Sequence, residues 1–154
     1  MSVSISSDEA DVSTTATTSG TPLSADRIKH LEFIQAVVTR LGNNSFLLKG
    51  WAMTLTAAIL ALSAGRFSWQ IALSGIVPLL GFWFLDSYFL RQERLFRALY
   101  EDARTPNSTV EMLSMNIGPY LARVTLAKAA FSQTLVLFYG ALLIAHFVVV
   151  LVAR

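Results

Sequence analysis

The chain has 154 residues, 54% of them hydrophobic and 14% charged, and its mean hydropathy is +0.55. This balance lies well above that of a soluble domain and predicts an integral membrane protein. There is no cysteine and there are only two histidines, His30 and His146, which excludes disulfides, thiol chemistry and a histidine metal cluster within one chain; we expect no cofactor and no metal. The net charge of +2 comes from basic residues that flank apolar runs, which argues against a nucleic-acid partner.

Residues 1–23 are rich in serine and threonine and lack the basic and apolar regions of a signal peptide. We expect them to form a disordered cytosolic tail. Residues 24–42 carry apolar side chains at helical spacing, which predicts an amphipathic helix that begins at the capping residue Ser24 and is interrupted at Gly42-Asn43-Asn44. Its apolar face would either lie on the membrane surface or pack against a neighbouring helix.

Two long apolar runs follow, residues 45–65 and residues 71–90. Each is roughly 20 residues long, which is enough to cross the hydrocarbon layer. The short loop GRFSWQ between them predicts a tight transmembrane hairpin. The second helix should continue into water until Thr105-Pro106-Asn107 stops it, so the hairpin with its cytosolic helical extension is predicted to cover residues 45–104.

The second span contains Gly75, Pro78 and Gly81. Proline removes a backbone donor and glycine tolerates bent backbone, so a kink or local unwinding is expected near the middle of the membrane. A gating hinge is one use of such a segment. A purely structural bend, which is common for proline in membrane helices, is the other.

Residues 105–130 are predicted to be a cytosolic helical connector. Ser108 and Glu111 have the spacing of a capping box that opens a short helix, and Pro119 is well placed to begin the next one. That helix would run on into a third span, residues 131–154. The predicted fold is therefore an all-α integral membrane protein with three transmembrane helices, an N-terminal amphipathic helix and a cytoplasmic helical loop.

The basic residues predict how these spans are oriented. In the three-span arrangement, every lysine and arginine except Arg66 and Arg154 falls on one side of the membrane, if Lys49 is counted there. Because basic loops are retained in the cytoplasm, the N-terminal tail and the loop of residues 91–130 should be cytoplasmic and the C-terminus outside.

Lys49 and Asp86 are opposite charges near the same end of the hairpin. Antiparallel packing brings them to a similar depth, and an unpaired charge in hydrocarbon costs about 3 kcal/mol on insertion scales. We therefore predict an ion pair, within one chain or across a subunit contact. The alternative is equally open: Lys49 extends to phosphate headgroups while Asp86 meets interfacial water.

Several arginines lie on or near the cytosolic extension of the second span. They could collect an anionic ligand near the inner leaflet, either a nucleotide signal or lipid headgroups. They are Arg91, Arg94, Arg97, Arg104 and Arg123. A solvated helix face, supported by i,i+4 pairs such as Glu93 with Arg97, explains the same residues without a ligand.

Small and polar residues inside the spans indicate how the helices pack. Ala57, Ala61 and Gly65 lie four residues apart and form a small-residue seam suited to close helix contact, which is compatible with a homo-oligomer. His146 in the third span could line a pore or sense pH, or it could simply bond a neighbouring helix.

No catalytic constellation emerges from the sequence. It contains no glycine-rich phosphate loop and no His-Glu-x-x-His helix, and its serines, histidines and aspartates do not form a plausible catalytic set. We therefore expect no catalytic residues and no enzyme activity.

The stretches NNSFLLKGWAMTLTAAILAL and WFLDSYFLRQERLFRALYED, with the short loop between them, resemble in layout the small bacterial two-transmembrane proteins of the SMODS- and SLOG-associating (SLATT) group. The resemblance covers roughly residues 25–104. It implies a bacterial inner-membrane effector of nucleotide-signalling or antiphage systems, which oligomerises and perturbs the membrane when a cytosolic partner detects infection. The third span departs from the group's pattern.

Two functions therefore remain open. The first, which the resemblance implies, is an oligomeric inner-membrane effector that perturbs membrane integrity or conducts ions when a cytosolic protein or nucleotide triggers it, with Lys49 and Asp86 as a latch. The second is a non-conducting membrane anchor or accessory subunit that docks a cytosolic partner through its arginine-rich helix. A transporter protomer is disfavoured because the sequence has no internal repeat.

Overall fold

A computed structural model describes residues 23–66 and 68–152 of the chain. Within these residues the regular structure is entirely helical, which is the predicted fold class. Three helical segments are long and apolar enough to cross a membrane, namely Ala25–Gly65, Trp69–Ala103 and Gln133–Val152. The protein is therefore a multi-pass membrane protein by helix length and composition. The predicted tail, apart from Leu23, lies outside the described residues.

The first helix, α1 (Ala25–Arg66), is one continuous element of 42 residues. The predicted interruption at Gly42-Asn43-Asn44 is therefore wrong, and the N-terminal helix and the first span are the same helix. The reason is tertiary: α1 packs along the third helix of the chain over this region, and Gly42 lies beside the carboxylate of Glu93. Glycine in a helix costs only about 1 kcal/mol relative to alanine, which packing along a whole helix outweighs.

The second span is divided into α2 (Trp69–Ser74) and α3 (Ile76–Ala103), with the break at Gly75. Pro78 explains the position of the break because it has no N–H to donate to the carbonyl of Ser74, four residues earlier. Gly81 lies inside regular α3 and takes no part in the break. The helix is thus interrupted only on the N-terminal side of Pro78, and Gly75 itself keeps helical dihedral angles.

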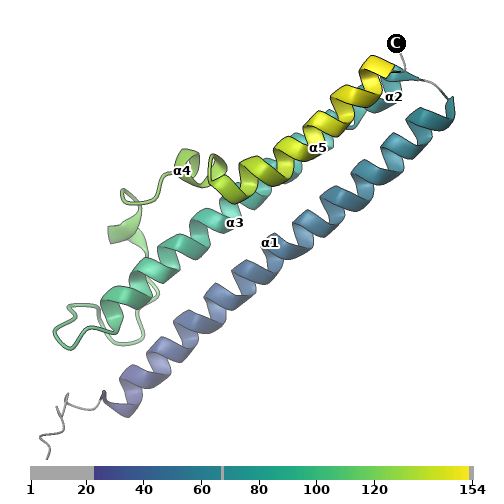
Figure 1. Ribbon diagram of the computed structural model, residues 1–154. Coiled ribbons are helices and arrows are strands. Elements are labelled where there is room, and N and C mark those ends of the chain that lie inside the picture. The colour runs from purple at the N-terminus through teal and green to yellow at the C-terminus, as the bar shows by residue number, and fades with distance from the viewer. Residues whose placement is uncertain (1–22, 67, 153–154) are drawn as a thin grey trace, which may run out of the picture.

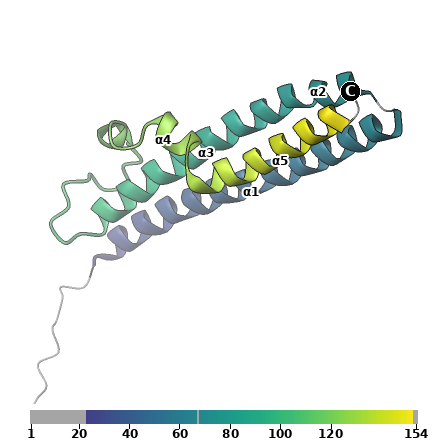
Figure 2. The same ribbon diagram turned by 45° about the horizontal axis from the view of Figure 1, so that its top comes forward.

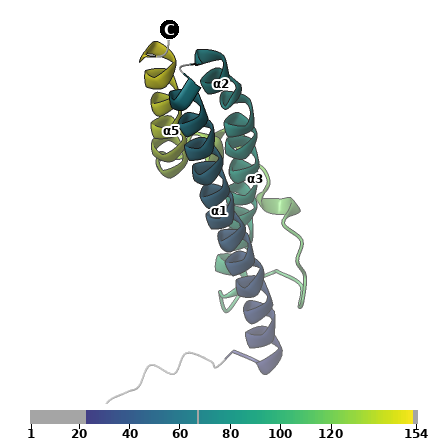
Figure 3. The same cartoon turned by 90° about the vertical axis from the view of Figure 1, so that its right-hand side faces the viewer.

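The last long helix, α5 (Gln133–Val152), forms the third span. It packs against α1, α2 and α3, and the three views agree that the long helices run side by side (Figures 1, 2 and 3). The C-terminal end of α5 lies beside α2, whereas the start of α1 lies at the opposite end of the bundle (Figure 1). Consequently α1 and α3 extend together well beyond α5 in one direction.

The connector between α3 and α5 is less helical than predicted. It holds only a 3-10 turn, η1 (Gly118–Tyr120), and a short helix, α4 (Leu126–Ala130). The helix expected to open at Ser108 is absent, because the Ser108 hydroxyl accepts from the backbone N–H of Val110 in a tight turn, and no helix follows. The continuous helix expected from Pro119 is also absent. Instead the connector runs back along α3 towards the start of α5 (Figure 1).

Two separate hydrophobic cores hold this arrangement together. We call the first the extension core; it lies between α1, α3 and the connector and comprises Ile34, Leu95, Leu99, Ala103 and Tyr120. We call the second the span core; it lies between α1, α3 and α5 and comprises Ala52, Leu79, Leu135 and Tyr139. The polar cluster described next lies between the two cores along α1 and α3.

Candidate functional site

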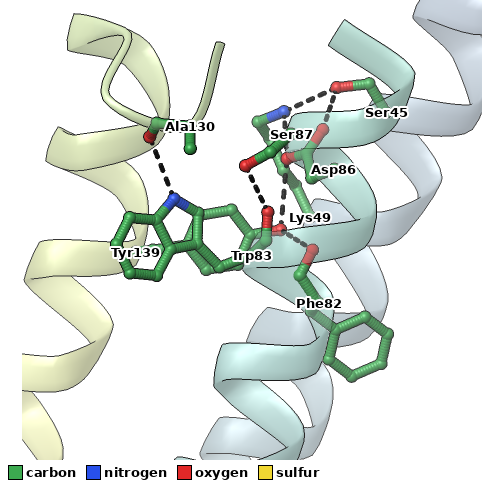
Figure 4. Close-up of polar contacts among 8 residues, drawn as sticks. All are labelled: Ser45, Lys49, Phe82, Trp83, Asp86, Ser87, Ala130 and Tyr139. Atoms are coloured by element: carbon green, nitrogen blue, oxygen red, sulfur yellow. Dashed lines mark hydrogen bonds and ion pairs between the residues drawn. The ribbon is translucent and has the colours of Figure 1, made fainter. Parts of the chain in front are cut away.

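The centre of the candidate site is the carboxylate of Asp86, which is completely buried on α3. Its Oδ2 atom lies 2.7 Å from the Nζ atom of Lys49 on α1. The Ser45 hydroxyl, one turn earlier on α1, donates to Oδ1, and Lys49 Nζ donates to the Ser45 Oγ atom at 2.8 Å (Figure 4). The structure thus forms the predicted Lys49–Asp86 ion pair, and it does so within one chain.

The third helix of the bundle also reaches this carboxylate. The Tyr139 hydroxyl of α5 lies 3.1 Å from Asp86 Oδ2 and 3.4 Å from the carbonyl oxygen of Phe82 (Figure 4). Sequence reasoning missed both Ser45 and Tyr139. The signal that was available for Tyr139 is a hydroxyl group in the interior of an apolar span, which must find a partner when it is buried.

The carboxylate of Asp86 is paired and hydrogen-bonded within the chain. Asp86 accepts from two residues of α1 and one of α5, so one carboxylate ties three helices together. Such a charge is expensive to bury and becomes tolerable only when it is paired and hydrogen-bonded. Among the described residues no group of three or more histidine, aspartate or glutamate side chains could hold a metal ion. The arrangement therefore ties α1, α3 and α5 together through one carboxylate.

Two of the predicted arginines hold the connector against α3. Arg91 Nε donates to the carbonyl oxygen of Val124 at 2.9 Å, and Arg94 Nη1 donates to that of Lys128 at 3.2 Å. Trp83, two turns earlier on α3, makes a comparable contact, since its indole N–H donates to the carbonyl of Ala130 at 3.0 Å (Figure 4). These side chains therefore position α4 along α3.

The other three predicted arginines have separate partners. Arg97 pairs with Glu93 at 2.7 Å, as the i,i+4 spacing predicts. Arg104 pairs with Glu101 at 2.7 Å, and the Arg123 guanidinium lies 5.3 Å from the centre of the Tyr120 ring. The five arginines therefore do not converge on one site in this structure.

The outer part of the connector is tied to both extended helices. On α1, Arg27 donates to the carbonyl of Val110 at 3.2 Å, and the buried His30 ring donates from Nε2 to the carbonyl of Ser114 at 2.8 Å. On α3, Asp102 accepts a 2.6 Å hydrogen bond from the Tyr120 hydroxyl. Burial, followed by the hydrogen bond and the charge of Asp102, raises the pKa of Tyr120 to about 12. The neutral hydroxyl is thus the form that the fold stabilises.

His146 lies at the break in the second span. It is completely buried on α5, and its Nδ1 atom is 2.9 Å from the carbonyl of Leu142. Its Nε2 atom has no hydrogen-bond partner and faces Gly75 so closely that a Cβ at that position would lie 2.5 Å away. The predicted bond to a neighbouring helix is not formed, because Leu142 lies on α5 itself; the ring only packs against Gly75 of the second span.

Comparison with known proteins adds no assignment. The chain matches no family model, no curated protein and no solved structure. The SLATT resemblance, which rests on the layout of the hairpin, stays a prediction.

Proposed function

We propose that the chain is a non-conducting membrane anchor or accessory subunit that presents a rigid helical platform to a protein partner. The observation that carries this proposal is the closure of the Asp86 cluster within one chain. A channel or transporter keeps buried charges available to a pathway, where they meet water or ions. Here the Asp86 carboxylate is instead bonded to side chains of α1 and α5, so it joins α1, α3 and α5.

The platform in this proposal is the part of the molecule beyond the spans. It consists of the extended ends of α1 and α3 with the connector clamped onto them. Because Arg91 and Arg94 hold the connector, the partner meets the connector and not a free arginine-rich helix. In a bacterial inner membrane with the predicted orientation, this surface lies in the cytoplasm.

A second candidate, the triggered oligomeric effector, is favoured by a different observation. The predicted small-residue seam of α1, Ala57, Ala61 and Gly65, is exposed and is not used for packing within the chain. An unused seam of this kind suits contact with a second copy. Conduction would then require the Asp86 cluster to separate, so that Lys49 and Asp86 act as a latch.

Dye entry into living cells separates the two functions. We would overproduce the wild-type chain and the Asp86→Asn variant in a bacterium and follow growth and the uptake of a membrane-impermeant fluorescent dye. If the chain is an anchor, growth should be normal and no dye should enter the cells with either chain. The effector predicts growth arrest and dye uptake, earlier with Asp86→Asn because the latch is weakened. Uptake with the wild-type chain would refute the anchor.

A matched control removes a charge pair outside the cluster. Lys29 and Glu32 form an exposed pair at 2.8 Å near the start of α1. The Glu32→Gln variant changes the net charge of the chain by the same amount as Asp86→Asn but leaves the cluster intact. It should behave like the wild type in both assays, so any effect of overproduction alone appears in the control as well.

A further inference from the structure

An apolar groove runs between α3 and α4, next to the Asp86 cluster. It has a volume of about 450 Å³. Its α3 wall is formed by Leu80, Trp83, Phe84 and Ser87, and its α4 wall by Leu126, Ala127, Ala130 and Phe131. On the predicted membrane placement, in which residues 71–90 cross the membrane, the α3 wall of this groove lies in the hydrocarbon region.

The polar groups in the groove walls are bonded within the protein. The Trp83 indole N–H donates to the Ala130 carbonyl, and the Ser87 hydroxyl donates to the Trp83 carbonyl at 2.6 Å (Figure 4). The accessible surface of the groove is therefore apolar, and its walls have no free hydrogen-bond donor that would recognise a polar ligand. Hydrocarbon is the chemistry that fits it.

A smaller apolar groove lies on the other side of the same aromatic pair. Its volume is about 210 Å³, and it is lined by Val136, Gly140 and Leu143 of α5 together with Trp83 and Phe131. The rings of Trp83 and Phe131 meet edge to face, with centroids 5.8 Å apart, and form the wall that the two grooves share. Two neighbouring apolar channels suit the two acyl chains of one phospholipid.

Two cationic residues, Arg94 and Lys128, lie beside the α4 wall of the larger groove without lining it. Arg94 reaches the backbone of α4 at Lys128, and Lys128 itself is exposed. The chain from residue 112 onwards contains no aspartate or glutamate, so no acid of the connector's second half offsets them. Basic side chains at a membrane surface attract anionic lipid headgroups.

We infer that the grooves on either side of Trp83 and Phe131 form a binding site for one anionic phospholipid. Its acyl chains lie along α3, α4 and α5, and its phosphate is held by Arg94 and Lys128. The lipid thereby completes the packing of α4 against the span. This site is independent of the proposed anchor or effector function, because neither function requires a particular lipid.

Quenching of tryptophan fluorescence by brominated lipids tests the site directly. One variant keeps only Trp83, through Trp51→Phe and Trp69→Phe. A matched variant keeps only Trp51, which is 64% exposed on α1 and serves as a reporter of bulk lipid. Each is placed in nanodiscs of phosphatidylcholine that contain a minor fraction of chain-brominated phosphatidylglycerol or, in a parallel sample, chain-brominated phosphatidylcholine.

The expected result is a headgroup preference at Trp83 alone. Each engaged cation should raise the occupancy of the anionic lipid about fivefold, which corresponds to about 1 kcal/mol. Trp51 should be quenched equally by the two brominated lipids. Equal quenching at Trp83 would overturn the proposal, and so would a preference of the same size at both tryptophans.

Three further variants of the Trp83 reporter distinguish a lipid site from general surface charge. Lys128→Gln should lower the preference, whereas Arg94→Lys keeps the charge and should preserve most of it. Ala127→Phe fills the groove and should reduce the quenching of Trp83 by both lipids. An Ala127→Phe protein that keeps its helix content by circular dichroism and its full preference at Trp83 would overturn the proposal.

Discussion

The two halves of the helical bundle each bury an apolar core, but they differ in where their charged groups lie. In the extension half, Leu95 and Leu99 are buried, and the charges of Arg97 and Arg104 lie at the surface. In the span half, the buried set includes the charged Asp86 together with polar Ser87, while large apolar side chains are exposed. The same two helices, α1 and α3, pass through both halves. On the predicted membrane placement, what changes along them is the solvent, water in one half and lipid in the other.

This difference shows which forces hold each half. Water drives the apolar core of the extension together, whereas lipid gives no such preference, so the spans rely on packing and on hydrogen bonds between helices. The Asp86 cluster supplies those bonds at the boundary between the halves. It is the one place where α1, α3 and α5 share a charged group in the described part of the chain. Substitutions in the two halves should therefore have different costs.

The largest effect is expected when Asp86 is changed to alanine. This change leaves Lys49 without its counter-ion and the Tyr139 hydroxyl without its acceptor, so it should lower the free energy of unfolding by about 3 kcal/mol. The estimate takes the lower end of the range for a broken buried pair because the Lys49 side chain is 21% exposed and can turn towards water. Unfolding in mixed micelles with increasing dodecyl sulfate, followed by circular dichroism, measures the change.

The control for this prediction is the exchanged pair. A chain that carries both Lys49→Asp and Asp86→Lys restores opposite charges at the same two positions. It should recover part of the stability lost in either single variant. If the double variant is no more stable than the less stable single variant, the attraction between the two charges contributes nothing and the pair is only a by-product of packing.

An effect of similar size tests the two halves with the same substitution, leucine to alanine. Leu95→Ala removes a completely buried side chain from the extension core and should cost about 3 kcal/mol. Leu137→Ala removes the same atoms from a side chain that is 65% exposed on α5, where lipid replaces them, and should cost less than about 1 kcal/mol. The same dodecyl sulfate titration measures both. Equal losses would show that the two halves are not held by different forces.

The hairpin, the third span and the Lys49–Asp86 pair could be read from the sequence because each depends on a local or one-dimensional property. A span is a run of apolar residues of sufficient length, and two opposite charges at matching depth in an antiparallel hairpin have few other partners. Helix breaks were harder to place. Gly42-Asn43-Asn44 has a poor propensity for helix, but the packing of α3 along α1 keeps the helix continuous, and no local pattern reports that contact.

The connector could not be predicted for a related reason. Ser108 and Glu111 have the spacing of a helix start, yet the segment is drawn along α1 and α3 by bonds from Arg27 and His30 to its backbone carbonyls. A bond from a side chain to a distant carbonyl depends on the path of the chain and not on the residue that supplies the carbonyl. The roles of Arg91 and Arg94 were missed for the same reason.

A smaller loss of stability is expected from a substitution at Gly75, the break in the second span, and it tests the contact between this break and α5. Gly75→Ala would place a Cβ atom 2.5 Å from His146 Nε2 and 3.0 Å from a methyl carbon of Ile59, so α5 must shift, at a cost of about 2 kcal/mol. Gly81→Ala is the matched control, because no heavy atom of another element lies within 4 Å of its Cβ position. It should be neutral or stabilise by up to about 1 kcal/mol. Adding His146→Ala to Gly75→Ala should restore part of the loss; no restoration would mean that the contact does not set the position of α5.

The smallest effect is expected at the hydrogen bond that closes the connector over the extension core. Tyr120→Phe keeps the ring and removes the donor to Asp102, so it should cost about 1 kcal/mol near neutral pH. The fold raises the pKa of Tyr120 from 10.0 to about 12, chiefly by burial, so the neutral hydroxyl contributes stability that is complete below pH 10 and is lost as the pH rises towards 12. Between these values the wild-type chain should lose stability more steeply than Tyr120→Phe, which has no proton to release. Because both chains carry the same lysines and arginines, titration of those groups is common to the two curves. Parallel curves across this range would show that the connector is held in place without the Tyr120–Asp102 bond, mainly by Arg27 and His30.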